Sequence, residues 1–384
     1  MINMNPRYFH SIDELDNLVG LRQKEREEME LVTQTFPFRA NEYYLSLIDW
    51  KVHHDPLRRI VIPDLRELKG GGSTDPSCEK DYTRLPGLQH KYTQTGLLLI
   101  SDVCGGICRF CFRKRLFIGC ERETIHDVSA GLDYIRSHPE ITNVLLTGGD
   151  PLTLETRRLE AILRELREIN HVNIIRIGSK MPAYNPYRII DDPALIAALA
   201  RYSTPEKRIY LMAHYNHPKE MTTVSLQAAE VLRKAGVIVV NQTPVLNEVN
   251  SDPAVFTELF RKLSFAGISP YYVFQCRPSL GNQFFQTPVE RSFEIIQQAF
   301  RASSGLAKRA RFVMSHATGK IEVVGKTANH VYMRYHQAAD KANIGKMLVF
   351  RSNPLARWFD DYLHHAVHVR DMFPISPQRM HWLF

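Results

Sequence analysis

The sequence predicts an α/β protein built on a partial (β/α)6 barrel of the TIM type, with an N-terminal helical arm and a C-terminal strand-rich extension. Short apolar runs alternate with amphipathic helical stretches, such as 154–169 and 225–236, and short turns separate them. This alternation indicates a parallel sheet with helices on its outside. Six units can close only part of a barrel. The six predicted strands cover 95–101, 142–147, 172–178, 208–214, 236–242 and 271–275.

The segments that flank the barrel differ from it in pattern. Residues 1–70 are polar with helical spacing, and the glycine-rich run 70–81 indicates a linker or loop. After about 310 the pattern changes to strand-like pieces at 319–325 and 330–337. We therefore expect three parts: an arm with its linker (1–85), the barrel (86–305) and the extension (306–384).

The composition is that of an ordinary globular protein, with 44% hydrophobic and 23% charged residues in a chain of 384. Its apolar runs are far shorter than the ~18–20 residues of a membrane-spanning helix, so no membrane association is expected. The start of the chain lacks the pattern of a signal peptide. Three of the six cysteines lie within eight residues, which favours metal-binding thiols in a reducing compartment over disulfides. We expect a cytoplasmic protein.

The net charge of +8 comes from 49 Lys and Arg against 41 Asp and Glu. A basic surface can attract nucleic acid. The excess here is mild, however, and is spread along the chain. An anionic cofactor or substrate is the simpler cause of local basic clusters, so nucleic acid is not the expected partner.

The strongest functional signal is a group of three cysteines directly after the first predicted strand. Cys104, Cys108 and Cys111 have the spacing C-x3-C-x2-C. Three thiolates can hold three irons of a [4Fe–4S] cluster and leave the fourth iron open to a small molecule. A structural zinc site or a ferredoxin would normally use a fourth ligand. The place of the loop after a strand also fits, because active sites in β/α barrels lie at the carboxyl ends of strands.

A second motif follows the next predicted strand. Gly148 and Gly149 let the backbone pass close to a ligand, and Asp150 adds a carboxylate. The glycines alone could simply form a turn. Beside the cysteine motif, we interpret them as the binding place of the methionyl amine of S-adenosylmethionine. The two motifs together predict a radical SAM enzyme.

Several blocks of sequence resemble one group of that superfamily, the lysine 2,3-aminomutase family. Family members use S-adenosylmethionine with its cluster and pyridoxal 5′-phosphate, and they move the α-amino group of an amino acid to its β-carbon by radical chemistry. The resemblance also implies an electron donor of the flavodoxin or ferredoxin type. The matching blocks are YYLSLID (43–49), DPLRRIVIP (55–63), PGLQHKY (86–92), CRFCFRKR (108–115), GGDPL (148–152), HVNIIRIGSKMP (171–182), HYNHP (214–218), VVNQTPVLNEVN (239–250) and PYYVFQC (270–276).

The resemblance assigns roles to individual positions. Arg113 matches the arginine that binds the α-carboxylate of the substrate, although a solvated basic turn is an alternative. Lys91 and Tyr92 match a pair near the pyridoxal phosphate, whereas Thr95 replaces a second arginine of that site. Four further positions match the S-adenosylmethionine side, or could equally be polar strand ends: Arg176, Ser179, His214 and Gln242.

The stretch that carries the pyridoxal lysine departs from the family pattern. Lys320 follows Thr-Gly, and Lys326 stands in Gly-Lys-Thr. Alignment from Phe312 favours Lys320, and the local motif favours Lys326. We expect Lys320 to hold the cofactor. A third alternative is that neither lysine does, since some relatives work without pyridoxal.

The substrate end of the site departs more strongly. Arg277 and Ser315 stand where lysine-specific members place aspartates that hold the distal ammonium. A guanidinium repels an ammonium, so lysine is a poor candidate and an amino acid with an anionic or hydrogen-bond-accepting tail, such as glutamate, is favoured. The alternative is that Arg277 points to solvent.

We therefore predict a radical SAM, pyridoxal-dependent 2,3-aminomutase, which is an isomerase, acting on a small amino acid other than lysine. The rival hypothesis is a radical SAM enzyme of the same ancestry with altered chemistry on a modified, peptide-borne or RNA-borne residue. A homo-oligomer is also considered. The aromatic segments 357–365 and 380–384 could pack on a partner or on their own barrel.

Overall fold

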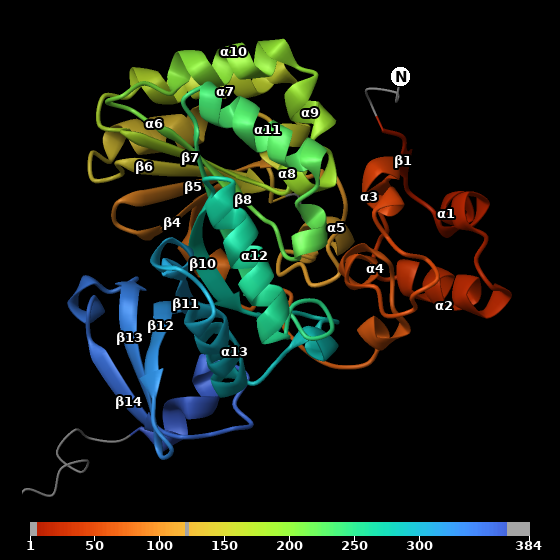
Figure 1. Cartoon of the computed structure of the whole chain (residues 1–384). Coiled ribbons are helices and arrows are strands. Elements are labelled where there is room, and N and C mark those ends of the chain that lie inside the picture. Colours follow the sequence, from red (N-terminus) through yellow and green to blue (C-terminus); the bar gives the residue numbers. More distant parts are fainter. Residues whose placement is uncertain (1–5, 120–122, 367–384) are drawn as a thin grey trace, which may run out of the picture.

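The structure is a computed structural model that describes residues 6–119 and 123–366. Its centre is one sheet of twelve strands, which lie in the sheet in the order of the sequence (Figure 1). A separate pair, β1 with β2, belongs to the arm. The strands are β1 (Tyr8–Phe9), β2 (Ala40–Asn41), β3 (Thr83–Leu85), β4 (Leu88–Tyr92), β5 (Thr95–Ser101), β6 (Asn143–Gly148), β7 (Ile174–Ser179), β8 (Ile209–Ala213), β9 (Ile238–Val245), β10 (Ser269–Gln275), β11 (Arg311–His316), β12 (Gly319–Lys326), β13 (His330–Ala338) and β14 (Met347–Arg351).

The middle of the sheet is a run of parallel strands from β5 to β11. The six strands expected from the sequence are β5 to β10, which confirms the predicted partial barrel. β11 adds a seventh parallel strand beside β10, at the point where the sequence pattern changes. The outermost strands β3 and β14 do not pair with each other, so within the described residues the barrel is open.

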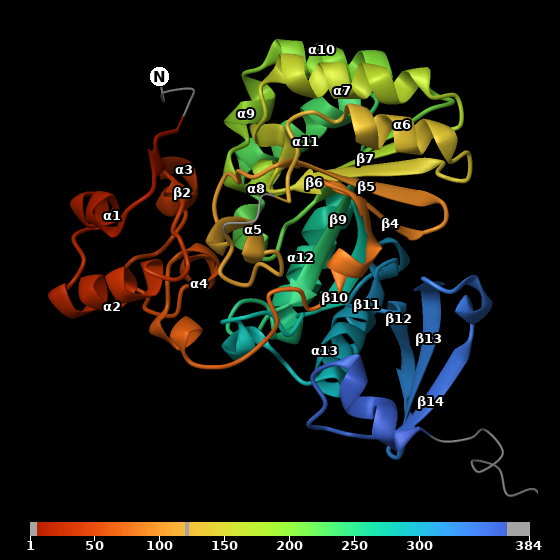
Figure 2. The ribbon, with the colours of Figure 1, turned by 180° about the vertical axis from the view of Figure 1, so that it is seen from behind.

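Amphipathic helices cover the outer face of the parallel strands in both views (Figures 1 and 2). In α7 the buried side chains are Leu159, Ile162, Leu163 and Leu166, which recur at the helical spacing and pack into the main core. The covering helices are α6 (Ser129–Ser137), α7 (Thr156–Glu168), α10 (Pro193–Tyr202), α11 (Thr223–Lys234), α12 (Pro253–Phe265) and α13 (Val289–Arg301). Three short helices lie in the connections after β5 and β7: α5 (Arg115–Ile118), α8 (Met181–Tyr184) and α9 (Tyr187–Ile190).

Antiparallel strands extend the sheet at both ends. β3 and β4 precede the parallel run, and β12, β13 and β14 follow it. The chain then returns through a 3-10 helix (Phe359–His365), with Trp358, Phe359 and Tyr362 buried in the main core. The aromatic segment 357–365 therefore packs on its own barrel, and 380–384 lies outside the described residues.

The N-terminal arm lies beside the barrel and has its own apolar cluster (Figure 1). Phe110 and Tyr184 of the barrel belong to that cluster, so the arm packs directly on the cysteine loop. The helices of the arm are α1 (Ile12–Val19), α2 (Gln23–Thr33), α3 (Glu42–Ser46), α4 (Pro56–Val61) and a 3-10 helix (Leu65–Leu68).

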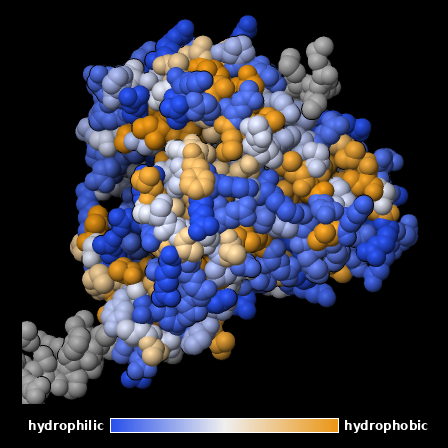
Figure 3. Space-filling view, in the orientation of Figure 1, coloured by the Kyte–Doolittle hydropathy of each residue, from blue (hydrophilic) through white to orange (hydrophobic). Residues whose placement is uncertain are grey.

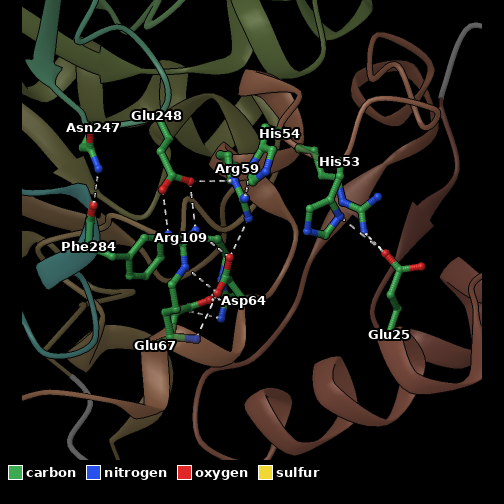
Figure 4. Close-up of polar contacts among 12 residues, drawn as sticks. Glu25, His53, His54, Arg59, Asp64, Glu67, Arg109, Asn247, Glu248 and Phe284 are labelled. Atoms are coloured by element: carbon green, nitrogen blue, oxygen red, sulfur yellow. Dashed lines mark hydrogen bonds and ion pairs between the residues drawn. The ribbon is translucent and has the colours of Figure 1, made fainter.

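Buried ion pairs join the arm to the barrel (Figure 4). Glu67 of the arm accepts hydrogen bonds from Arg109 at 2.7 and 2.9 Å and from Lys114 at 3.1 Å. All three side chains are buried. Nearer the surface, Glu248 of the barrel pairs with Arg59 of the arm at 3.0 Å. The two parts therefore form one structural unit around the loop that carries the cysteines.

The surface seen in Figure 3 is mainly hydrophilic, with apolar side chains interspersed among polar ones. Most large apolar residues instead lie in the two buried clusters. Within the described residues, the structure has no helix that is both long and apolar enough to cross a membrane.

The buried ion pair makes a testable prediction about stability. Glu67→Gln should lower the free energy of unfolding by about 3–5 kcal/mol, because it leaves two cations buried without their counter-charge. Chemical denaturation measures this change. The control is Glu230→Gln, which breaks an exposed pair with Arg233 and should change the free energy of unfolding far less. Equal, small losses in both variants would contradict the proposed role of the buried pair.

Candidate active site

A cavity of about 320 Å³ opens at the carboxyl ends of the parallel strands, a size typical of small-molecule and cofactor sites. Thr95, Arg176 and Ser315 lie in its wall. Of the other candidate residues named from the sequence, all but Lys326 also line it: Lys91, Tyr92, Cys104, Cys108, Cys111, Arg113, Gly148, Gly149, Asp150, Ser179, His214, Gln242, Arg277 and Lys320.

The cysteine loop is held by the arm through backbone hydrogen bonds. Ile107 N–H donates to the carbonyl of Arg39 at 2.9 Å, and Arg109 N–H donates to that of Ile60 at 2.8 Å. Gly105 lies against α8, where an added Cβ would be 2.5 Å from the sulfur of Met181. A larger residue in the first half of the loop would therefore push it away from α8.

The donor set of this loop suits an iron–sulfur cluster. The three cysteines are free thiols that line one cavity from one tight loop. Burial raises the pKa of each thiol, to about 12 for Cys108, so a cationic cluster would supply the charge that keeps them as thiolates. Three cysteine ligands leave one iron of a cubane for a small ligand.

The Gly148-Gly149-Asp150 turn brings the ends of β5, β6 and β7 together. Gly148 has φ +119°, and a Cβ there would lie 2.4 Å from the carbonyl oxygen of Ser101. The carboxylate of Asp150 accepts hydrogen bonds from the hydroxyl of Ser179 at 2.9 Å and from the backbone N–H of Lys180 at 2.7 Å. Burial raises the pKa of Asp150 to about 6. Asp150 and Ser179 thus brace the cavity wall as well as lining it.

His214 directly follows β8 and Gln242 lies within the neighbouring strand β9, and both line the cavity. The Nε2 atom of His214 is buried and has no hydrogen-bond partner among the described residues. Burial, and then the charge of Lys180, lowers the pKa of His214 to about 3, so its imidazole is neutral. An unpaired buried nitrogen in a cavity wall is a candidate contact for a bound ligand.

The two candidate pyridoxal lysines occupy different environments. The ammonium of Lys320 lies over the rings of Tyr92 and Tyr272, 5.0 and 5.6 Å from their centroids. No described residue accepts a hydrogen bond from it, and burial lowers its pKa to about 7. Lys326 instead lies outside the cavity and pairs with Glu290 and Glu294 at 3.0 and 2.7 Å. The geometry therefore favours Lys320.

Lys91 and Tyr92 lie on the same side of the cavity as Lys320. Lys91 Nζ donates to the carbonyl oxygen of His316 at 2.6 Å, and burial lowers the pKa of Lys91 to about 8. Burial raises the pKa of Tyr92, so its phenol is neutral. A cation and a hydroxyl beside a reactive amine suit the phosphate of pyridoxal phosphate.

Glu79 holds Arg113 in place, and sequence reasoning did not identify it. Its carboxylate accepts hydrogen bonds from Arg113 Nε and Nη2 at 3.0 and 2.8 Å and from Arg115 at 2.7 Å. Arg113 Nη1 donates to Thr147 at 3.0 Å. These contacts use three of the five N–H donors of Arg113, so two remain for a ligand. Arg113 is buried, not a solvated turn.

Arg277 faces the cavity rather than solvent. Its guanidinium stacks on Phe112, 3.6 Å from the ring centroid, and its Nη1 is 4.0 Å from Glu79. That nitrogen is buried without a hydrogen-bond partner among the described residues. Burial is also the main cause that lowers its pKa, to about 10. A half-buried guanidinium with an unused donor nitrogen is a candidate anchor for an anion.

Comparison with known proteins identifies the family. Residues 98–259 match the model of the Radical SAM superfamily. A protein of Aquifex aeolicus named "Putative L-lysine 2,3-aminomutase" is 52% identical over 91% of this chain and 94% of its own length. The L-lysine 2,3-aminomutase of Clostridium subterminale is 36% identical over 90% of this chain and 82% of its own. The Glutamate 2,3-aminomutase of Clostridioides difficile is 34% identical over 77% of this chain and 69% of its own length. The chain therefore belongs to the 2,3-aminomutase family of radical SAM enzymes, which are isomerases.

Proposed function

We propose that this protein is a 2,3-aminomutase that depends on S-adenosylmethionine, a [4Fe–4S] cluster and pyridoxal 5′-phosphate, and that its substrate is an amino acid with an anionic tail, such as glutamate. The observation that carries the proposal is the unpaired amine of Lys320, a half-buried side chain in the same cavity as the three cysteines. A lysine with a pKa of about 7 is partly neutral at physiological pH and can react with an aldehyde.

Different residues of the chain would bind the cluster, pyridoxal and the substrate. Cys104, Cys108 and Cys111 would hold the cluster, and Lys320 would hold pyridoxal. When bound, these groups supply a carbon-centred radical from S-adenosylmethionine and delocalisation of the substrate's unpaired electron over the pyridoxal ring. Arg113, positioned by Glu79, would bind the α-carboxylate with its two remaining N–H donors. An external electron donor would complete the system.

The charge of the cavity supports an anionic substrate. Of the described residues that line it, six are Lys or Arg (Lys91, Arg113, Arg176, Lys180, Arg277 and Lys320), of which Lys320 is partly neutral, and two are carboxylates (Glu79 and Asp150). A second ammonium, such as the tail of lysine, would enter this field without an evident counter-charge. A carboxylate tail would instead satisfy the unused donor of Arg277. The relative named as a glutamate aminomutase indicates that such substrates occur in the family.

The pyridoxal assignment predicts one specific site of attachment. After incubation with pyridoxal phosphate and reduction with borohydride, peptide mass spectrometry should find the cofactor on Lys320. Lys320→Ala should lose this modification, and Lys326→Ala should keep it. The rate of attachment should be half-maximal near pH 7 and fall below it, because protonation removes the lone pair of the amine. Attachment at Lys326, or a rate that keeps rising to about pH 10, the range of an ordinary lysine, would contradict the assignment.

The substrate assignment predicts a change of selectivity in Arg277→Asp. Its kcat/KM for glutamate should fall at least about 30-fold, or ~2 kcal/mol, because the tail carboxylate loses its cationic partner and meets a like charge. The value for lysine should not fall in proportion. Arg233→Asp, a charge reversal at the surface, is the control and should leave both values unchanged. If the ratio of kcat/KM for glutamate to kcat/KM for lysine is unchanged in Arg277→Asp, Arg277 does not select the tail of the substrate.

A further inference from the structure

We propose that Tyr184 donates a hydrogen bond to the sulfur of Cys108 and thereby raises the reduction potential of the cluster. The phenol oxygen of Tyr184 is 2.9 Å from Cys108 Sγ. Tyr184 is only 1% exposed, and its hydroxyl has no other hydrogen-bond partner among the described residues. The inference rests on the cluster part of the proposed function and is independent of pyridoxal and of the substrate.

The direction of this hydrogen bond follows from the chemistry of the sulfur. Between a free thiol and a phenol, either group can donate. A cysteine that binds iron is a thiolate and has no proton to give. The phenol of Tyr184 is then the donor and the sulfur of Cys108 the acceptor.

Contacts from the arm and from the cysteine loop fix the position of Tyr184. Asn41 of the arm donates to the carbonyl oxygens of both Tyr184 and Gly105, at 2.8 and 2.9 Å, so one amide joins α8 to the cysteine loop. The ring of Tyr44 packs edge-on against that of Tyr184, with 4.5 Å between centroids. A Cβ at Gly106 would be 3.2 Å from the Tyr184 ring. The hydroxyl is therefore held against the sulfur and cannot swing to water.

The nearby ionic groups are already paired with each other. Lys180 lies 5.0 Å from the centre of the Tyr184 ring, and its ammonium binds Glu220 at 2.6 Å. The hydroxyl of Tyr44 also donates to Glu220, at 2.6 Å. The hydroxyl of Tyr184 is thus directed at the sulfur of Cys108, whereas the hydroxyl of Tyr44 donates to the carboxylate of Glu220.

The effect on the potential follows from charge. Reduction adds an electron to the cluster, and part of that charge resides on the sulfur ligands. A hydrogen bond to a ligand sulfur stabilises the more negative, reduced state and so raises the reduction potential. Tyr184 is a positioning residue, because it acts on the cluster through the sulfur of Cys108.

The experiment measures the reduction potential of the cluster and not a rate of turnover. Wild type, Tyr184→Phe and Tyr44→Phe are reconstituted anaerobically with iron and sulfide, and the midpoint potential of each cluster is measured by titration followed with electron paramagnetic resonance. Tyr184→Phe should give a more negative midpoint than wild type at equal iron content. Tyr44→Phe removes an equally buried hydroxyl from the adjacent ring and should shift the midpoint far less.

Replacement of Tyr184 by 3-fluorotyrosine gives a second measurement in which the ring is retained. Fluorine makes the phenol a stronger donor, so the midpoint should move to more positive values than in wild type. The measurement on the fluorotyrosine protein decides the question if Tyr184→Phe fails to assemble a cluster. Equal midpoints in wild type and both Tyr184 variants, or equal shifts in Tyr184→Phe and Tyr44→Phe, would overturn the inference. Failure of wild type itself to assemble a cluster would instead contradict the proposed function.

Discussion

The geometry of the cysteine loop depends on the hydrogen bonds that the buried carboxylate of Glu67 accepts. Glu67 comes from the arm and binds Arg109 and Lys114, which follow the second and third cysteines of the motif. Backbone hydrogen bonds at Ile107 and Arg109 join the same surfaces. Separation of the arm from the barrel would leave two cations buried without a counter-charge, which is far more costly than the loss of an exposed pair. The arm is thus part of the cluster site.

Burial controls the charge states inside the cavity. It lowers the pKa of Lys320 and Lys91 and raises that of Asp150, while Glu79 keeps a low pKa because three arginines offset the cost of its burial. The result is a cavity that orients its arginines firmly and retains unused donors. Such an arrangement suits several anionic groups at once, which a cofactor phosphate, the carboxylate of S-adenosylmethionine and an acidic substrate would bring.

The parts of the structure that the sequence predicts are those with local signals. Apolar runs at fixed spacing predict the strands β5 to β10, and the cysteine spacing predicts the loop after the first of them. The local sequence around Lys320 and Lys326 is not sufficient to choose between them, because that choice depends on the register of the β12 hairpin. Ser315 of β11 is opposite Lys320, whereas Lys326 lies six residues on, about 20 Å along the strand.

The residues that sequence reasoning missed act across long separations in the chain. Glu79 lies in a polar run that indicates only a linker, yet its partner Arg113 is 34 residues away. Tyr184 reaches a sulfur 76 residues away, and Glu67 reaches Arg109 over 42 residues. Each is an ordinary residue in its local sequence. Its role follows from the contacts that the fold creates, so the sequence predicts the cavity and its cysteines better than the groups that position them.

Turnover under anaerobic conditions is the decisive measurement of the proposed reaction. The protein, loaded with iron, sulfide and pyridoxal phosphate, is reduced with dithionite in the presence of S-adenosylmethionine and either glutamate or lysine, and the products are analysed by mass spectrometry. We expect 5′-deoxyadenosine together with the β-amino isomer of glutamate, and little isomer from lysine. An efficient conversion of lysine with none of glutamate would contradict the proposed substrate, and 5′-deoxyadenosine without any amino acid isomer would contradict the aminomutase function itself.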